Sequence, residues 1–484
     1  MAWVAFAPLL YAMADARTGR EATRLGYVTG AVASTGILYW ASLVVIQYGG
    51  LSLPMGLLVM SLLCLAVAGF PALFGWSLGR LCRRYGHAGL LLAPFLWVAV
   101  EMLRAYTTFR FPWCLVGYSQ YRLLPMIQLA AVTGVYGISF LVVMSSALLA
   151  FAARERDPRR RRAALGGLAA MLLAVALHGT WTLSRPIVET GRVRAGLVQA
   201  SISQDAKWDD SRERENLERH LALSRDAARA GATLIVWPES AVPFFFDREP
   251  AIADQLRAFT RETGTTLIFG NDDIERSSAG YRLWVGAKML GPDGQLLYRY
   301  HKNRLVPFGE YVPLKSLLTL GGKLVLRMVR AVGDFVPGTE ATVGRFEGHA
   351  VGTSICYEAI FADYVRQFSA NGAELLVNIT NDGWYGRTSA PSQHFAMAVF
   401  RAVENRKWLL RAANTGITGI VDPRGRIVAR TELFDRRALV GEAAFVPGLT
   451  FYGRFGDVFG WSCLVAAVAL VASTYRRRSP APLS

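Results

Sequence analysis

The sequence predicts a multi-span α-helical membrane domain joined to an extramembrane α/β domain with four layers in the order α-β-β-α. The chain has 484 residues, 52% of them hydrophobic, and a mean hydropathy of +0.28. A soluble enzyme of this length is usually more polar. The apolar excess lies in residues 1–182 and 457–474, whereas residues 192–450 alternate strand-like and helix-like runs. That alternation is typical of an α/β sheet layer, and two such sheets with outer helices make a four-layer sandwich.

Long apolar stretches define the predicted membrane domain. Most of them approach the length of about 20 residues that a helix needs to cross a bilayer. They are residues 2–14, 25–47, 54–79, 88–106, 125–151, 163–182 and 457–474.

Basic segments alternate with weakly charged ones between these stretches and so predict an orientation. Residues 17–24, 80–87, 154–163 and 475–479 are basic, whereas the intervening connections, 48–54 and 108–125, carry few charges. Basic connections remain in the cytoplasm. We therefore expect residues 192–450 on the periplasmic side of a bacterial inner membrane and 475–484 as a basic cytoplasmic tail. The same rule explains the net charge of +17, so nucleic-acid binding is not needed to account for it.

The first apolar stretch is short for a span, because only about 13 apolar residues, against the roughly 20 that a span needs, precede Asp15. A signal peptide is disfavoured, since no basic segment precedes the apolar run. We expect that one upstream span is missing, or that this stretch enters the bilayer only part of the way.

The predicted α/β domain contains both crossover helices and hairpins. Strands are expected at residues 193–200, 233–237, 265–270, on both sides of the turn at 292–294, at 349–356, at 374–380 and on both sides of 422–426. Helices are expected at 209–230, 249–263, 358–370 and 391–410.

Three candidate catalytic residues, Glu239, Lys302 and Cys356, each lie at or just past the end of a strand-like run. Cys356 is the only cysteine of the α/β domain, so it is either a buried structural residue or a nucleophile. A thiol nucleophile needs a base, which Glu239 can supply, and Lys302 can stabilise the thiolate and a developing oxyanion. The sequence lacks CxxC, HExxH and clustered His/Cys spacings, so neither a metal site nor a cofactor is expected.

Two further features suggest contact with lipid. Residues 311–332 alternate apolar and basic side chains and contain two glycines, which favours an amphipathic arm in the membrane interface over a span. Phe244 and Phe245 follow the Glu239 turn, where they serve either as core residues or as contacts for an acyl chain. His301 and His394 lie near the candidate residues, where structural hydrogen bonding is more common than a role as base.

The motifs TLIVWPES, KNRLVPFGEYVPL, SICYE and NITNDGWYG resemble the nitrilase (carbon–nitrogen hydrolase) superfamily, whose Glu-Lys-Cys triad matches Glu239, Lys302 and Cys356. With FPWCLVGYSQ and QHFAMAVFRAVENRKWLLRAANTGITG, nearly the whole chain resembles the membrane-embedded branch, the apolipoprotein N-acyltransferases. The departure is the abbreviated N-terminus, where that family normally has one more span.

The resemblance implies transfer of an acyl chain from a phospholipid, through a cysteine thioester, to the α-amine of the diacylglyceryl-cysteine that begins a bacterial apolipoprotein. Glu239 is then the general base, Lys302 the oxyanion stabiliser and Cys356 the nucleophile. The implied supporting residues are Glu310, which orients Lys302 and the thiol, Tyr357 and Glu358 at the nucleophile turn, and Trp208 and Trp384 at the entrance. We expect a monomer with no nucleic-acid partner.

Two other readings share these residues. A membrane-tethered amidase or nitrilase, hydrolysing C–N bonds, needs the same triad but only one tethering span. A non-catalytic membrane scaffold needs no intact triad.

Overall fold

The computed structural model describes residues 1–107, 110–207, 210–241, 244–277, 280–312 and 335–475. The chain divides into two compact units. The helical unit contains Met1–Ser42, Ser52–Arg185 and Phe455–Ser484, and the α/β unit contains Leu43–Leu51 and Pro186–Arg454. The short segment Leu43–Leu51, whose first five residues end the apolar stretch predicted at 25–47, thus belongs to the α/β unit.

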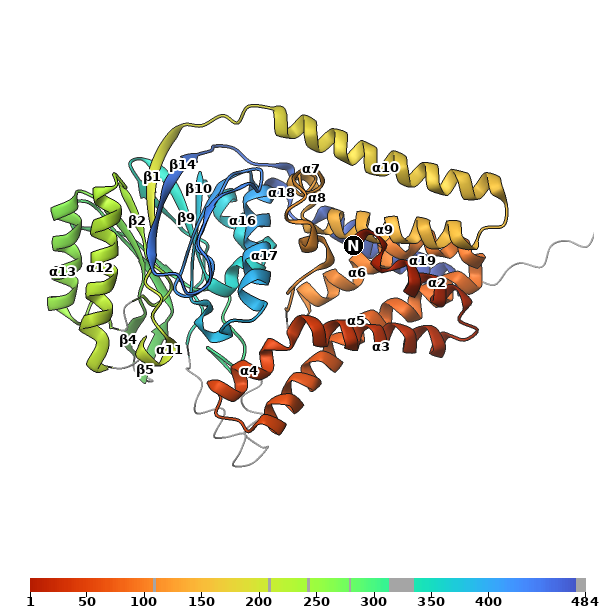
Figure 1. Ribbon diagram of the computed structural model, residues 1–484, viewed down its shortest axis with the longest axis horizontal. Coiled ribbons are helices and arrows are strands. Elements are labelled where there is room, and N and C mark those ends of the chain that lie inside the picture. The colour runs from red at the N-terminus through yellow and green to blue at the C-terminus, as the bar shows by residue number, and fades with distance from the viewer. Residues whose placement is uncertain (108–109, 208–209, 242–243, 278–279, 313–334, 476–484) are drawn as a thin grey trace, which may run out of the picture. The chain divides into compact units, whose positions relative to one another are not determined.

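Every apolar stretch predicted from the sequence is helical (Figure 1). The helices in or next to these stretches are α1 (Ala2–Ala5), α2 (Ala7–Asp15), α3 (Gly19–Leu38), α4 (Trp40–Gln47), α5 (Leu53–Tyr85), η1 (Gly86–Leu92), α6 (Ala93–Tyr106), η2 (Val116–Gln120), α7 (Leu124–Ile127), α8 (Ala130–Thr133), α9 (Val135–Arg154), α10 (Pro158–Ser184), α18 (Phe451–Phe455) and α19 (Val458–Ser473).

Among the described residues, three helical runs are long and apolar enough to cross a membrane. They are Leu53–Tyr106, Val135–Arg154 and Pro158–Ser184, and a fourth results if α3 and α4, bent by 53°, form one span. The stretch predicted at 125–151 is not one helix. Gly134, with a φ of +63°, separates α8 from α9, and glycine adopts this left-handed conformation without a steric penalty.

Helices α3 and α5 pack closely through small residues. A Cβ atom at Gly26 would lie 2.2 Å from the carbonyl oxygen of Pro71, and one at Gly75 would lie 2.3 Å from that of Ala22. Small residues of this kind let helix backbones approach directly in a membrane. These close contacts, which we call the α3–α5 seam, hold the start of α3 beside the end of α5.

Within the described residues, the α/β unit is built on two six-stranded sheets, ordered β14-β1-β2-β3-β6-β7 and β13-β12-β11-β10-β9-β8. The first sheet contains β1 (Gly191–Gln199), β2 (Leu234–Val236), β3 (Thr266–Gly270), β6 (Gly286–Leu290), β7 (Leu296–His301) and β14 (Arg437–Phe445). The second contains β8 (Val343–Phe346), β9 (His349–Ile355), β10 (Leu375–Thr380), β11 (Trp408–Ala413), β12 (Gly419–Val421) and β13 (Ile427–Arg430). A separate hairpin pairs β4 (Asp273–Ser277) with β5 (Gly280–Trp284).

Helices cover the outer face of each sheet, which confirms the predicted four-layer sandwich (Figure 1). The helices α12 (Glu213–Arg229) and α13 (Pro250–Thr263) flank the first sheet, and α16 (Ala362–Ala370) and α17 (Ala390–Asn405) flank the second. Leu221, Phe259 and Phe269 are buried between α12, α13 and the first sheet. The short helices α11 (Gln204–Lys207), η3 (Asp210–Arg212), η5 (Cys356–Ile360) and η6 (Asp382–Tyr385) lie in the connections.

The helix predicted at 391–410 is too long, because α17 ends at Asn405. Arg406 takes a left-handed conformation with a φ of +52°, and the chain then enters the buried strand β11. The apolar run WLL suits a helix or a central strand equally, and its pairing with β10 decides the outcome.

Candidate active site

Cys356 lies directly after the central strand β9, where the chain turns sharply into η5. Its φ of +47° is unusual for a residue with a side chain, so surrounding contacts must hold this turn. The turn places the thiol at the carboxyl ends of the parallel strands β9 and β10. Ligands and catalytic groups of α/β sheets gather at this edge.

Glu358 connects the Cys356 turn to the strand end that carries Lys302. Its carboxylate accepts hydrogen bonds from the backbone N–H of Ile355 at 2.8 Å and of Asn303 at 2.6 Å. The hydroxyl of Tyr300 donates to it at 2.7 Å. Burial nonetheless raises the pKa of Glu358 to about 7. Glu358 therefore joins the Cys356 turn to the chain just after β7, away from solvent.

Lys302 connects two carboxylates in a buried cluster that we call the lysine network: Glu239, Lys302 and Glu310. The Lys302 side chain is fully buried, and its Nζ donates to Glu239 Oε1 at 2.9 Å and to Glu310 Oε1 at 2.5 Å. The second oxygen of each carboxylate accepts a backbone N–H, from Asn381 for Glu239 and from Val306 for Glu310. These bonds fix all three side chains in one arrangement.

The lysine network carries one negative charge more than positive when all three groups are ionised. Burial lowers the pKa of Lys302, but the two carboxylates outweigh burial and hold that pKa well above its usual value. Burial raises the pKa of Glu310, with Lys302 opposing the shift and the charge of Glu239 reinforcing it. The raised pKa of Glu310 thus favours its neutral form, which reduces the excess negative charge of the network.

The Cys356 thiol interacts electrostatically with Glu239, Lys302 and Asp382, so the structure brings the three predicted catalytic residues together. Burial and the nearby Glu239 raise the pKa of this thiol far above its usual range, despite the opposing charge of Lys302. A thiol in this state is not a preformed thiolate. It becomes a nucleophile only when a base removes its proton during the reaction.

A second ionic cluster, the arginine network of Asp382, His394 and Arg411, contacts the backbone of Cys356. His394 Nδ1 is 2.9 Å from Asp382 Oδ1, and His394 Nε2 is 3.1 Å from the carbonyl oxygen of Cys356. Arg411 Nη2 donates to Asp382 Oδ2 at 3.0 Å. Both candidate histidines thus hydrogen-bond away from the thiol, since His301 Nε2 lies on Asp273 at 2.8 Å.

Among the described residues, Cys356, Asp382 and His394 form a group with metal-like spacing, with one ligand atom each within 4.8 Å of the others. The guanidinium of Arg411 neutralises Asp382, and both nitrogens of His394 already have hydrogen-bonding partners. Such pairing favours a hydrogen-bonded support over a metal centre.

Lys207 adds a third buried cation that the sequence analysis missed. Its Nζ donates to the backbone carbonyl of Glu239 at 3.0 Å, and burial lowers its pKa to about 8 despite the carboxylates of Glu239 and Asp272. Ser240, with a φ of +40°, donates to Asp272 at 3.1 Å. Lys207 and Asp272 thus support the turn that carries Glu239. The one feature of the sequence that pointed to Lys207 was its position next to Trp208, which was predicted to line the entrance.

The predicted substrate-contact residues differ in exposure. The Trp384 side chain is 38% exposed, and Tyr48 packs edge-on against it at 4.9 Å while donating to the Gly383 carbonyl at 3.2 Å. Phe244 belongs to the hydrophobic core, whereas Phe245 is half-buried. Tyr357 is buried against Phe361.

Two predicted features lie outside the described residues, namely Trp208 and the arm at 311–332 apart from Tyr311 and Val312.

Comparisons with known proteins agree with this geometry. The carbon–nitrogen hydrolase family profile matches residues 194–443, and the profile of the apolipoprotein N-acyltransferase N-terminal domain matches residues 1–148. Among solved structures, an amidase from Nesterenkonia sp. has a TM-score of 0.40 at 22% identity, covering 56% of this chain and 96% of its own. Nit3 of Saccharomyces cerevisiae has a TM-score of 0.41 at 20% identity, covering 54% of this chain and 93% of its own. The family profile over residues 194–443 identifies the α/β unit as a carbon–nitrogen hydrolase domain.

Curated relatives match over the full length. An apolipoprotein N-acyltransferase of Geobacter metallireducens is 42% identical over 99% of this chain and 92% of its own length. Those of Methylococcus capsulatus and Vibrio vulnificus are 33% and 30% identical, over 95% and 97% of this chain and 88% and 91% of their own lengths. The chain belongs to the apolipoprotein N-acyltransferase family, which confirms the predicted resemblance.

Proposed function

We propose that this membrane enzyme transfers an acyl chain from a phospholipid, through a thioester on Cys356, to the α-amine of the diacylglyceryl-cysteine of bacterial apolipoproteins. The observation that carries the proposal is the buried Lys302 held between Glu239 and Glu310 beside a neutral thiol. Full-length similarity to apolipoprotein N-acyltransferases supports the choice of acceptor.

Acylation of the enzyme is the first step. Glu239 removes the proton from the Cys356 thiol as the sulfur attacks the ester carbonyl of the phospholipid. The ammonium of Lys302 stabilises the oxyanion that forms. The tetrahedral intermediate then breaks its carbon–oxygen bond, and Glu239 returns the proton to the leaving alkoxide. A lysophospholipid departs, and the acyl chain remains on Cys356 as a thioester.

Transfer to the amine is the second step and uses the same residues in reverse. The acceptor's neutral α-amine attacks the thioester carbonyl, Glu239 removes one amine proton, and Lys302 again stabilises the oxyanion. The carbon–sulfur bond breaks, and the Cys356 sulfur takes the proton back from Glu239. The products are an N-acyl amide and the free thiol.

The supporting residues have positional roles in this scheme. Glu310 orients Lys302 by accepting its second hydrogen bond, and Glu358 and Tyr357 support the nucleophile turn. Trp208, Trp384, Phe244 and Phe245 are proposed to contact substrate. Trp384 and Phe245 are partly exposed and so can reach a substrate more easily than Phe244, which packs in the core.

The alternating basic segments support a periplasmic location for the α/β unit at the inner membrane. We further propose that the enzyme acts as a monomer. The alternative, a membrane-tethered amidase, needs one tether. The chain instead has several apolar helices and matches acyltransferases along 99% of its length.

Mass spectrometry of a lipoprotein N-terminus tests this proposal. In a bacterium depleted of its own N-acyltransferase, the wild-type protein should restore the mass of one acyl chain to the N-terminal cysteine, and Cys356→Ala should not. If the lipoprotein remains diacylated with folded wild-type protein present, the proposed acceptor is wrong.

A further inference from the structure

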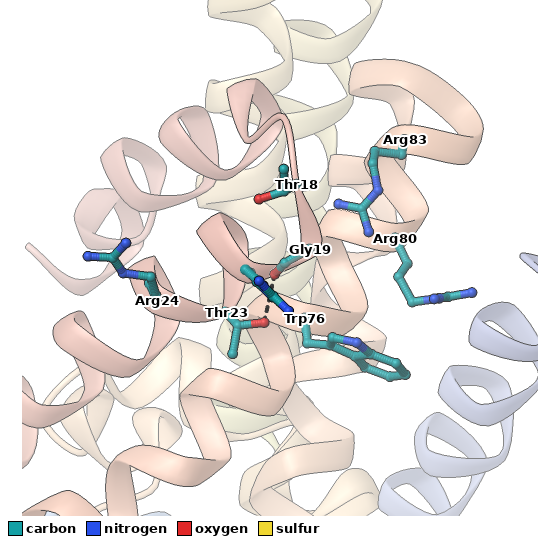
Figure 2. A pocket seen from close by; sticks show the side chains of 8 residues that line it. Thr18, Gly19, Thr23, Arg24, Trp76, Arg80 and Arg83 are labelled. Atoms are coloured by element: carbon teal, nitrogen blue, oxygen red, sulfur yellow. Dashed lines mark hydrogen bonds between the residues drawn. The ribbon is translucent and has the colours of Figure 1, made fainter.

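The helical unit contains a basic cavity far along the chain from Cys356. Its volume is about 800 Å³, and it lies where α3 begins and α5 ends (Figure 2). Four arginines, Arg20, Arg24, Arg80 and Arg83, line it together with Thr23 and Trp76. Within the part of the chain that the structure describes, no carboxylate lines it.

The positive charge of this cavity is not neutralised by the described part of the chain. There, the guanidinium groups of Arg20, Arg24 and Arg83 have neither a carboxylate within 4 Å nor a hydrogen-bonding partner. Glu21, in the same turn, instead accepts the backbone N–H of Arg17 at 2.8 Å. Like charges that share one cavity repel each other, and a bound anion removes that cost.

Arg80 forms a fixed wall of the cavity. Its Nε donates to Thr474 at 3.2 Å, and its guanidinium lies 3.9 Å from the centre of the Tyr475 ring and 5.3 Å from that of Trp76. The wall therefore joins the end of α5 to the end of α19. Arg83 approaches the start of α3 so closely that a Cβ at Gly19 would lie 3.2 Å from its Nη2.

The cavity changes from charged to apolar along α5. Trp76, Arg80 and Arg83 follow each other at helical spacing, with the indole toward the apolar part of the helix and Arg83 nearest its end. The small-residue seam between α3 and α5 holds both helix ends together at this level. Guanidinium groups at the end of a span with an aromatic ring below them match a lipid that has a charged headgroup and apolar tails.

We propose that this cavity binds the phosphate headgroup of an anionic phospholipid in the leaflet next to the basic segments 17–24 and 80–87. The site is independent of acyl transfer, because it lies in the helical unit and contains none of the proposed catalytic residues. A phosphate group is also offered by inorganic phosphate, but Trp76 and the neighbouring apolar helix surface favour the lipid. Phosphatidylglycerol is a suitable probe, and phosphatidylcholine provides the same tails without net charge.

The test follows thermal unfolding of the full-length protein in detergent while each lipid is added. Phosphatidylglycerol should raise Tm with a saturable midpoint, and phosphatidylcholine should not. The variant Arg20→Ala/Arg24→Ala/Arg83→Ala should need roughly a hundredfold more phosphatidylglycerol, since each of the three arginines near a membrane surface contributes about a factor of five.

A matched control removes the same charge from another basic segment. Arg159→Ala/Arg161→Ala/Arg162→Ala lies at the exposed start of α10 and should keep the wild-type midpoint. An equal shift in both triple variants, or a rise without saturation, would mean diffuse surface electrostatics and would overturn the site. Protection by inorganic phosphate as strong as that by phosphatidylglycerol would overturn the lipid assignment.

A second measurement uses only the wild-type protein and so does not depend on the variant folding. A phosphatidylglycerol carrying a photoreactive group should label peptides that contain residues 18–24 and 76–83. Excess unlabelled phosphatidylglycerol should suppress that label. Labelling spread evenly over all apolar helices, without this competition, would contradict the proposal.

Discussion

Two ionic networks in the described residues flank Cys356, and they differ in how their charge is balanced. The lysine network combines two carboxylates with one ammonium, so its full ionisation leaves one uncompensated negative charge. The arginine network pairs Asp382 with Arg411. Burial raises the pKa of Asp382, but Arg411 and His394 outweigh burial and hold that pKa below its usual value. An unbalanced network can exchange a proton, whereas a balanced one holds a fixed geometry. In the proposed mechanism, the lysine network therefore takes part in proton transfer, and the arginine network holds the position of Cys356.

The largest effect is expected from the lysine network. Glu239→Gln keeps a carbonyl oxygen for Lys302 but removes the base, so the rate of thioester formation should fall about 100-fold or more. Intact-protein mass spectrometry of the acyl-enzyme measures this rate. The matched control is Glu262→Gln on the outer surface of α13. A rate within threefold of wild type would remove Glu239 from proton transfer.

A smaller and different effect is expected from the arginine network. His394→Ala removes the donor to the Cys356 carbonyl, so kcat should fall roughly tenfold to a hundredfold through misplacement of the thiol, with KM nearly unchanged. His394→Gln should recover part of the loss, because its amide nitrogen can reach the position of Nε2. Equal losses of kcat in the two folded variants would show that the hydrogen bond to the carbonyl is unimportant.

The pH dependence of thermal stability tests the burial of Lys207. Its folded pKa of about 8 lies below the unfolded value of about 10.4, so its contribution to stability is present above the unfolded value and is lost as pH falls toward 8. Between pH 8 and 10, wild-type Tm should therefore rise relative to that of Lys207→Met, by a stability difference on the order of 1–3 kcal/mol. Parallel Tm curves for the two proteins would contradict a Lys207 whose pKa is lowered by burial.

The smallest effect concerns the support of Trp384. Tyr48→Phe removes the hydroxyl that donates to the Gly383 carbonyl but keeps the ring contact. One such hydrogen bond contributes about 1 kcal/mol, so turnover should fall about threefold to fivefold. Steady-state kinetics with phospholipid and a diacylglyceryl peptide measures this fall in turnover. No change in turnover would mean that Tyr48 does not position Trp384.

The sequence predicted the fold well and allowed a catalytic triad to be proposed, because strand ends and strand-like runs are local features. Glu239, Lys302 and Cys356 each follow such a run, and their convergence results from the sheet order. Asp382, His394 and Arg411 were harder to predict, because their alignment requires η6, α17 and β11 to meet around one turn. Lys207 was missed for a related reason: nothing in the sequence shows that its side chain is buried against the Glu239 carbonyl.

The helical unit was less predictable in detail. Apolar composition located its helices, but the break at Gly134 and the assignment of Leu43–Leu51 to the α/β unit depend on packing. The α3–α5 seam likewise depends on which glycines face each other.

The central claim is that the acyl group on Cys356 persists as a thioester until an acceptor amine binds. Incubated with phospholipid alone, the protein should accumulate one acyl chain on Cys356 that hydroxylamine releases. Adding a diacylglyceryl-cysteine peptide with a free α-amine should then convert the acyl-enzyme to N-acyl peptide. If no acyl-enzyme accumulates, and free fatty acid appears at the same rate with and without peptide, the protein is a hydrolase and the account is contradicted.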